Sequence, residues 1–147
     1  MTEDKKHYTP REIFERVKSA TIGKDPDYAD LYAEDGAHEL PFAPPGVPKR
    51  IEGREKIRAF LEAASANAPM KFTEFANVRI HDTDEPGTII CEYDLHGEVV
   101  KTGAPFVFGY VLLIHVQHGK IKLIRDYMDS LAMTTALGGL HGATKSE

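Results

Sequence analysis

The chain has 147 residues, which fits one domain with a single hydrophobic core. Its formal net charge is −5 at pH 7 and its charges are interspersed, which argues against nucleic acid or an anionic membrane surface as a partner. Cys91 is the one cysteine, so an internal disulfide and a cysteine-based zinc site are excluded. Residues 1–7 have no apolar signal core and no apolar run approaches the roughly 20 residues that span a bilayer, so the expected location is cytoplasmic.

The N-terminal part of the chain predicts three helices. A capping box at residues 9–12, with Pro10 at the first helical position, starts a helix that ends at Gly23. A short helix is expected within residues 25–32, and a third helix within residues 54–66. The buried stripe of this third helix is expected to consist of Ile57, Phe60, Leu61 and Ala64.

From residue 71 onward the pattern predicts strands. Four long strands are expected at residues 71–82, 88–96, 106–116 and 121–129, and short turns join them into an antiparallel meander. A short strand is expected earlier, at residues 37–42, before a proline-rich loop. The strand at residues 106–116 has no polar face, so its outer side is expected to meet a second copy of the chain.

The order of these elements indicates the fold class. Helices come first and strands follow without βαβ alternation, which is typical of an α+β fold. We expect a cone in which three N-terminal helices pack on a curved, mainly antiparallel sheet and leave an apolar pocket at the wide end. Residues 1–147 are expected to form one domain, with an ordered core at about residues 9–135 and tails on both sides.

Four segments occur in an informative order and spacing: residues 30–37, 52–57, 119–121 and 125–129. Together they resemble the SnoaL-like branch of the nuclear-transport-factor-2-like superfamily over roughly residues 10–132. Within that superfamily, the stretch from residues 82–86 through 96–97 and the segment at residues 119–122 are most similar to the phenazine-biosynthesis proteins. The resemblance implies a cystatin-like roll and a protein related to polyketide cyclases and ketosteroid isomerases.

Several residues that related enzymes use are replaced at the matching positions. Leu40 stands where ketosteroid isomerases have their general base, and Arg16 where they have a tyrosine on the first helix. Tyr93 and Leu95 match the arginine and aspartate of the epoxide-hydrolase relatives, and Phe60 matches a histidine of the phenazine proteins. These differences argue against the isomerase and epoxide-hydrolase mechanisms and imply a more apolar pocket.

Asp126 is the leading candidate for a catalytic residue. Side chains alternate along a strand, so Asp126 shares one face with Ile124 and Met128. In the related proteins this face looks into the pocket, and a carboxylate at this position serves as general acid or base. Burial between two apolar side chains would raise its pKa toward a range that is useful for acid–base catalysis. The alternative is a surface aspartate paired with Arg125 or a lysine.

Other polar residues are expected to face the same pocket. His38, on the strand face of Leu40, is a second catalytic candidate that could move protons or orient a ligand, or could simply lie hydrogen-bonded at the rim. The hydroxyls of Tyr93 and Tyr110 could bind a ligand carbonyl, although both residues could also be core. The remaining residues expected to line the pocket and bind substrate are Leu40, Phe60, Phe108, Leu112 and Met128.

Three functions are compatible with this pattern. The first is a cofactor-free isomerase or cyclase, with lyase or hydrolase chemistry as alternatives, in which Asp126 moves a proton of a small hydrophobic substrate. The second is a non-catalytic binding protein for a hydrophobic metabolite. The third is an assembly protein whose interior is filled by bulky side chains such as Phe42 and Phe72.

The seven histidines are scattered without a His-Glu-x-x-His pattern, so no metal site is expected. We expect a homodimer formed through the sheet.

Overall fold

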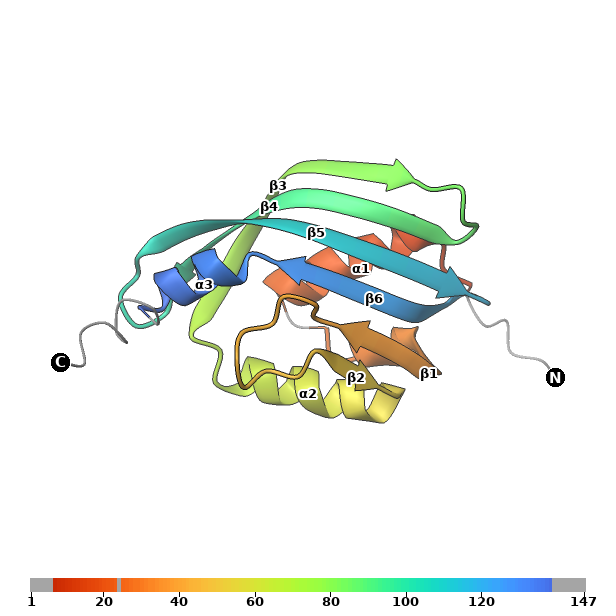
Figure 1. Cartoon of the computed structure of the whole chain (residues 1–147), viewed down its shortest axis with the longest axis horizontal. Helices are drawn as coiled ribbons and strands as arrows, with labels where there is room; N and C mark the ends of the chain where they lie inside the picture. The colour runs from red at the N-terminus through yellow and green to blue at the C-terminus, as the bar shows by residue number, and fades with distance from the viewer. Residues whose placement is uncertain (1–6, 24, 139–147) are drawn as a thin grey trace.

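The computed structural model describes residues 7–23 and 25–138, and within them it shows helices packed on one mainly antiparallel sheet (Figure 1). The strands are β1 (Tyr32–Glu39), β2 (Arg50–Glu52), β3 (Met70–Asp82), β4 (Thr88–Val99), β5 (Pro105–Gln117) and β6 (Lys120–Met128). Their order across the sheet is β2-β1-β6-β5-β4-β3, and the β1–β6 pair is parallel. The predicted α+β class is confirmed.

Helix α1 (Pro10–Ile22) begins and ends where the sequence predicts. The backbone N–H of Glu12 donates to Thr9 Oγ1 at 3.1 Å, and the backbone N–H of Thr9 donates to Glu12 Oε1 at 3.0 Å. This capping box satisfies two N–H groups that the first helical turn leaves without partners. The helix ends at Gly23 and buries Ile13, Phe14 and Val17 against the sheet.

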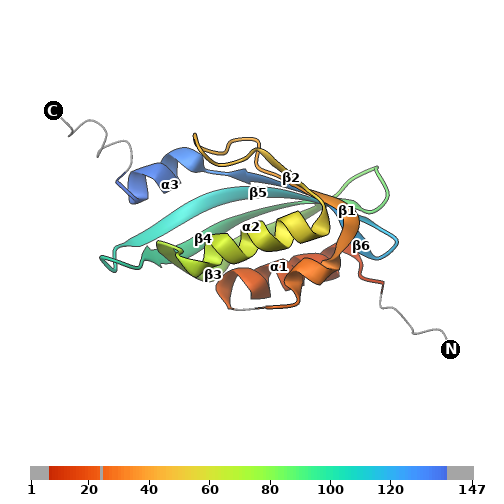
Figure 2. The same ribbon diagram turned by 90° about the horizontal axis from the view of Figure 1, so that it is seen from below.

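Helix α2 (Arg54–Ala66) also matches its predicted bounds, but its buried stripe is narrower than expected. Ile57 alone is fully buried, Phe60 and Leu61 are half-buried, and Ala64 is exposed. Both α1 and α2 lie on the same face of the sheet (Figure 2), which we call the inner face.

Strand β1 differs from its prediction, which placed a strand at residues 37–42. The 3₁₀ helix η1 (Tyr28–Leu31) leads directly into β1 at Tyr32, and the strand ends at Glu39. Pairing with β6 extends the strand toward the N-terminus. Gly36 permits this close approach, since a Cβ atom there would lie 2.8 Å from the backbone oxygen of Ile121. Strand β2, which follows the proline-rich loop, was not predicted.

The four long strands match β3 to β6 within three residues at each end, and a short helix then follows that the sequence analysis missed. This helix, α3 (Ser130–Ala136), is capped by the Asp129 carboxylate, which accepts from the backbone N–H of Ala132 at 2.9 Å. The predicted tails lie largely outside the described residues. No helix of the described ranges is long and apolar enough to cross a membrane.

The two faces of the sheet differ in burial. On the inner face the alternating residues of β4, β5 and β6 form one hydrophobic core with α1 and Ile57. On the opposite face, which we call the outer face, Val107, Gly109 and Val111 of β5 are exposed. The strand is therefore apolar on both sides, as its sequence indicates, with one side uncovered within the described chain.

Candidate functional site

Asp126 lies on the inner face of β6, opposite Leu112 of β5 and between the inner-facing residues Ile124 and Met128. The residue as a whole is half-buried, but its Oδ1 atom has no solvent contact and no hydrogen-bond partner among the described residues. Burial disfavours the charged form and raises the pKa of this carboxyl to about 7. The neighbouring Arg125 pairs with Glu39 on the outer face, so the alternative of a surface Asp126–Arg125 pair is wrong.

Four tyrosine hydroxyls share this interior with Asp126. They belong to Tyr28, Tyr32, Tyr93 and Tyr110. Burial raises the pKa of each hydroxyl, and the negative charge of Asp126 raises it further. The rings of Tyr93 and Tyr110 stack with their centroids 5.4 Å apart. All four hydroxyls therefore stay protonated at neutral pH and can donate hydrogen bonds.

His38 is hydrogen-bonded to one of these tyrosines, Tyr32. It is 8% exposed, and its Nδ1 atom lies 2.9 Å from the hydroxyl oxygen of Tyr32. That oxygen lies 3.5 Å from the hydroxyl oxygen of Tyr28. Burial lowers the pKa of His38 to about 4, so the imidazole is neutral at physiological pH. We refer to Asp126, His38, Tyr28, Tyr32, Tyr93 and Tyr110 as the inner polar cluster.

Two members of this cluster, Tyr28 and Tyr32, were missed as site residues by the sequence analysis. The sequence pattern predicts both on one short helix, whereas the helix ends at Leu31 and Tyr32 begins β1. Tyr32 starts the strand that carries His38 and Tyr28 lies four residues before it, and this spacing at the start of β1 is the signal that could have found them.

Most of the remaining predicted residues lie where the strand pattern places them. Leu40, Phe108 and Leu112 are buried in the same core, while Phe60 and Met128 are half-buried at its margin. Their role in substrate binding stays a prediction. Phe42 is different, because it is 58% exposed and contacts Tyr127 on the outer face. It cannot fill the interior as the assembly hypothesis assumed.

Two further residues, Arg16 and Cys91, lie outside the inner polar cluster. Arg16 donates to the Asp25 carboxylate from Nε at 3.0 Å and from Nη2 at 2.9 Å, so its guanidinium is held in an ion pair. Cys91 is fully buried, and burial raises the pKa of its thiol to about 12, which keeps it unreactive. In the described part of the chain, no three His, Cys, Asp or Glu side chains gather in a way that could hold a metal ion.

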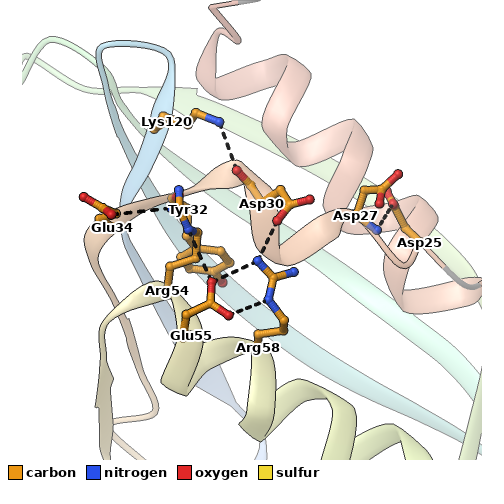
Figure 3. A network of polar contacts seen from close by, with 9 residues as sticks. All are labelled: Asp25, Asp27, Asp30, Tyr32, Glu34, Arg54, Glu55, Arg58 and Lys120. Atoms are coloured by element: carbon orange, nitrogen blue, oxygen red, sulfur yellow. Dashed lines mark hydrogen bonds and ion pairs between the residues drawn. The ribbon is translucent and has the colours of Figure 1, made fainter.

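A surface network holds the segment that carries Tyr28 and Tyr32 (Figure 3). Arg58 of α2 bonds to the Asp30 carboxylate, and Lys120 donates to the Asp30 carbonyl at 3.0 Å. Arg54 donates to the carbonyl of Tyr32 at 3.3 Å. These contacts lie on both sides of the junction between η1 and β1, so α2 and β6 fix the backbone from which the two tyrosines project.

A hollow of about 720 Å³ lies on the outer face rather than beside Asp126. Its floor consists of outward-facing residues from four strands, namely Arg79, Glu92, Asp94, Gly109, Val111 and Tyr127. Phe42 and Leu131 form part of its wall, and Tyr93, Tyr110 and Met128 also border it. The pocket expected inside the cone therefore stays a prediction, and this outer hollow is a feature that the sequence analysis did not foresee.

Comparison with known proteins agrees with this architecture. The sequence model of the SnoaL-like domain family matches residues 12–124 of this chain. An uncharacterised PhzA/B-like protein of Pseudomonas aeruginosa is 32% identical over 118 residues, which are 80% of this chain and 82% of that protein. The phenazine biosynthesis protein PhzB of Pseudomonas fluorescens is 30% identical over 112 residues, which are 74% of this chain and 68% of that protein.

Solved structures show the same fold. A Bacillus subtilis protein proposed to be an isomerase superposes with a TM-score of 0.80 at 28% identity, covering 88% of this chain and 93% of that one. A phenazine biosynthesis-related protein of Pseudomonas aeruginosa superposes with a TM-score of 0.71 at 22% identity, covering 88% of this chain and 81% of that one. The six-stranded sheet, the helices on its inner face and the match over residues 12–124 lead to one conclusion: this chain belongs to the SnoaL-like domain family.

Proposed function

We propose that this protein is a cofactor-free isomerase or cyclase that acts on a small, uncharged, hydrophobic carbonyl compound through acid–base chemistry at Asp126. The observation that carries the proposal is the Oδ1 atom of Asp126, which is buried without a hydrogen-bond partner among the described residues. A carboxyl with a pKa of about 7 is present in both protonation states at neutral pH. It can therefore accept a proton from a substrate carbon and return it to another position, which regenerates the enzyme.

The rest of the inner polar cluster suits the oxygen of such a substrate. When the proton leaves the carbon beside a carbonyl, negative charge develops on the carbonyl oxygen. Protonated tyrosine hydroxyls and a neutral imidazole can stabilise that charge by donating hydrogen bonds in a site that excludes water. Tyr93 and Tyr110 are the substrate-binding tyrosines of this proposal, and His38 is its second polar contact.

The route into the interior is proposed at the end of the molecule where α3 lies. Apolar side chains from α2, β3, β5, β6 and α3 contact the core there and stay partly exposed, namely Phe60, Phe72, Phe106, Met128 and Met133. Figures 1 and 2 show the ends of these elements meeting at one side of the molecule. Partly exposed apolar residues next to a buried polar cluster are typical of the mouth of a ligand site.

Exchange of carbon-bound hydrogen in D₂O tests the proposal without knowledge of the natural substrate. The probe is 2-tetralone, a compact aromatic ketone with acidic protons beside its carbonyl. We expect the wild-type protein to accelerate the exchange, as followed by ¹H NMR, and Asp126→Asn to lower the rate by about 10²–10⁴-fold. The matched control is Glu98→Gln, which neutralises an exposed carboxylate of β4 and should leave the rate unchanged.

Two results would overturn the catalytic role. Equal exchange rates for the wild type and Asp126→Asn would remove Asp126 from the mechanism. Binding of 2-tetralone without any acceleration of exchange would favour the second candidate function, a non-catalytic binding protein for a hydrophobic metabolite. The apolar surroundings of the cluster support that alternative equally well.

We further propose that the protein is a homodimer whose copies meet through their outer faces. Four of the exposed large apolar residues lie on or beside this face, namely Phe42, Val107, Val111 and Leu131. Arg79, Glu92 and Asp94 place both signs of charge around the outer hollow, so the face can complement itself across a two-fold axis. Gly109 leaves the centre of a long strand without a side chain, which is typical of a place where another backbone approaches.

A further inference from the structure

His38 has a polar atom for which the fold supplies no partner. Its Nδ1 atom is taken by Tyr32, but Nε2 makes no hydrogen bond to any described residue. The side chain is 8% exposed, but among the described residues Nε2 is not one of the fully buried atoms that lack a partner, so it keeps some contact with accessible space. A molecule bound in that space can accept or donate the hydrogen bond that the fold leaves open at Nε2.

The bond between Tyr32 and His38 determines which ring nitrogen carries the proton. A phenol hydroxyl has one proton, and imidazole nitrogen is a better acceptor than a second phenol oxygen. The His38 nitrogen is also nearer to the Tyr32 hydroxyl, at 2.9 Å against 3.5 Å for the Tyr28 oxygen. Tyr32 therefore donates to Nδ1 and accepts from Tyr28. A neutral imidazole whose Nδ1 accepts a bond carries its proton on Nε2.

We propose that Tyr32 is a positioning residue that holds His38 as the neutral Nε2–H tautomer, so that His38 donates a hydrogen bond to the substrate and does not act as its base. The ligand class follows from this assignment: a molecule that offers an acceptor, such as a carbonyl oxygen or an aromatic ring nitrogen. The tautomer itself follows from the contacts of this chain, while its role in binding rests on the proposed function of Asp126.

The strand register places His38 and Asp126 within reach of one small molecule. His38 pairs with Ile124 across the β1–β6 ladder, and Asp126 lies two residues further along the same face. Strands about 4.8 Å apart and an offset of about 6.6 Å place the two Cα atoms roughly 8 Å apart. An acceptor atom at His38 and an acidic C–H group at Asp126 fit within that span. The two residues then have separate roles, one as donor and one as acid or base.

Long-range ¹H–¹⁵N NMR spectra of protein labelled at histidine test the tautomer without any ligand, because the ring nitrogens have different shifts with and without a proton. We expect His38 to show a bare Nδ1 and a protonated Nε2, unchanged from pH 5 to pH 8. Tyr32→Phe removes the donor and should give a mixture of tautomers. Tyr28→Phe is the matched control, since it leaves the Tyr32–His38 bond in place and should preserve the Nε2–H form.

A protonated Nδ1 or a charged imidazolium at pH 7 in the wild type would overturn the proposal. So would a tautomer that Tyr32→Phe leaves unchanged, because Tyr32 would then have no positioning role. None of these spectra involves Asp126, so their failure is distinct from failure of the proposed function.

Two variants of His38 test the donor role. The amide of His38→Gln can place an N–H group near the Nε2 position, whereas the shorter amide of His38→Asn reaches only the Nδ1 position. In the 2-tetralone exchange assay we expect His38→Gln to retain most of the wild-type rate and His38→Asn to lose on the order of 10²-fold. Equal rates for the two variants would overturn the donor role. Absence of exchange in the wild type would count against the proposed function alone.

Discussion

At the residue scale, one physical cause accounts for the two opposite pKa shifts in the inner polar cluster. Burial disfavours charge, so it raises the pKa of the Asp126 carboxyl to about 7 and lowers the pKa of the His38 imidazole to about 4. The carboxyl becomes useful for proton transfer at neutral pH, while the imidazole becomes unable to take up a proton there. In the proposed mechanism this separation gives the acid–base role to Asp126 and a hydrogen-bonding role to His38.

Asp126→Asn is expected to change the pH dependence of stability. The folded state holds the Asp126 proton up to pH of about 7, whereas the unfolded chain releases it near pH 4. Because the folded state binds more protons in that window, this residue makes the wild type progressively less stable as pH rises from 4 to 7. The variant should therefore gain stability relative to the wild type across this window, by up to about 4 kcal/mol above pH 7.

Urea unfolding at pH 4.5 and pH 8 measures this difference. Glu98→Gln is the control, and the free energy of unfolding of this exposed variant should follow the wild type at both pH values. A constant difference between Asp126→Asn and the wild type at the two pH values would mean that the carboxyl has an ordinary pKa in the folded protein.

At the element scale, two glycines of the sheet should respond in opposite ways to the same substitution. A Cβ atom at Gly97 of β4 would lie 2.4 Å from the backbone oxygen of Lys71 and 2.5 Å from Cζ of Phe106. A Cβ atom at Gly109 of β5 would have no atom within 4 Å. The β3–β4 pair and the Phe106 ring therefore require glycine at position 97. At position 109 the described chain leaves room for a side chain.

Gly97→Ala is expected to lower the free energy of unfolding by about 1–3 kcal/mol, because the backbone of β3 and the Phe106 ring must shift. At a concentration low enough to keep the chains monomeric, Gly109→Ala should leave it unchanged or raise it by about 0.5–1 kcal/mol, since alanine restricts the unfolded chain more than glycine does. Thermal or urea unfolding of the two variants side by side checks this. Equal losses of unfolding free energy in the two variants would contradict the difference between the two glycine environments.

The sequence predicts regular elements best where one physical signal dominates. The capping box defines α1 and the alternation from residue 71 onward defines β3 to β6, because both signals are local. The start of β1 escapes prediction since the strand depends on pairing with β6, which is distant in sequence. Helix α3 is short and has no fully buried residue, so its pattern carries little periodicity.

The candidate site shows the same difference between local signals, which the sequence reveals, and contacts between distant backbone positions, which it does not. The inward direction of Asp126, Tyr93 and Tyr110 follows from alternation along strands and agrees with the register of the sheet. The contact between Tyr32 and His38 joins two ends of β1 across a register irregularity near Gly36. Simple alternation does not reveal such a contact, so this part of the site required the structure.

At the scale of the whole molecule, the uncovered outer face leads to a prediction about assembly. We expect the wild type to sediment as a dimer, with twice the 16.3 kDa mass of one chain. Gly109→Arg places a long charged side chain in the outer hollow and should give a folded monomer, because nothing in the described chain obstructs that position. The control is Val100→Arg at the exposed turn between β4 and β5, which should remain dimeric.

Sedimentation equilibrium with circular dichroism distinguishes the outcomes. A monomeric wild type would contradict the proposed dimer, and so would a Gly109→Arg variant that stays folded and dimeric. The acid–base proposal does not depend on this result, since Asp126 and His38 are not among the residues that line the outer hollow.

The proposed function depends above all on a buried carboxyl that titrates near neutral pH. A direct measurement is the ¹³C NMR titration of the Asp126 side-chain carboxyl, assigned through the loss of its signal in Asp126→Asn. We expect a midpoint at a pH of about 7. A midpoint near pH 4, the ordinary value for aspartate, would contradict this expectation.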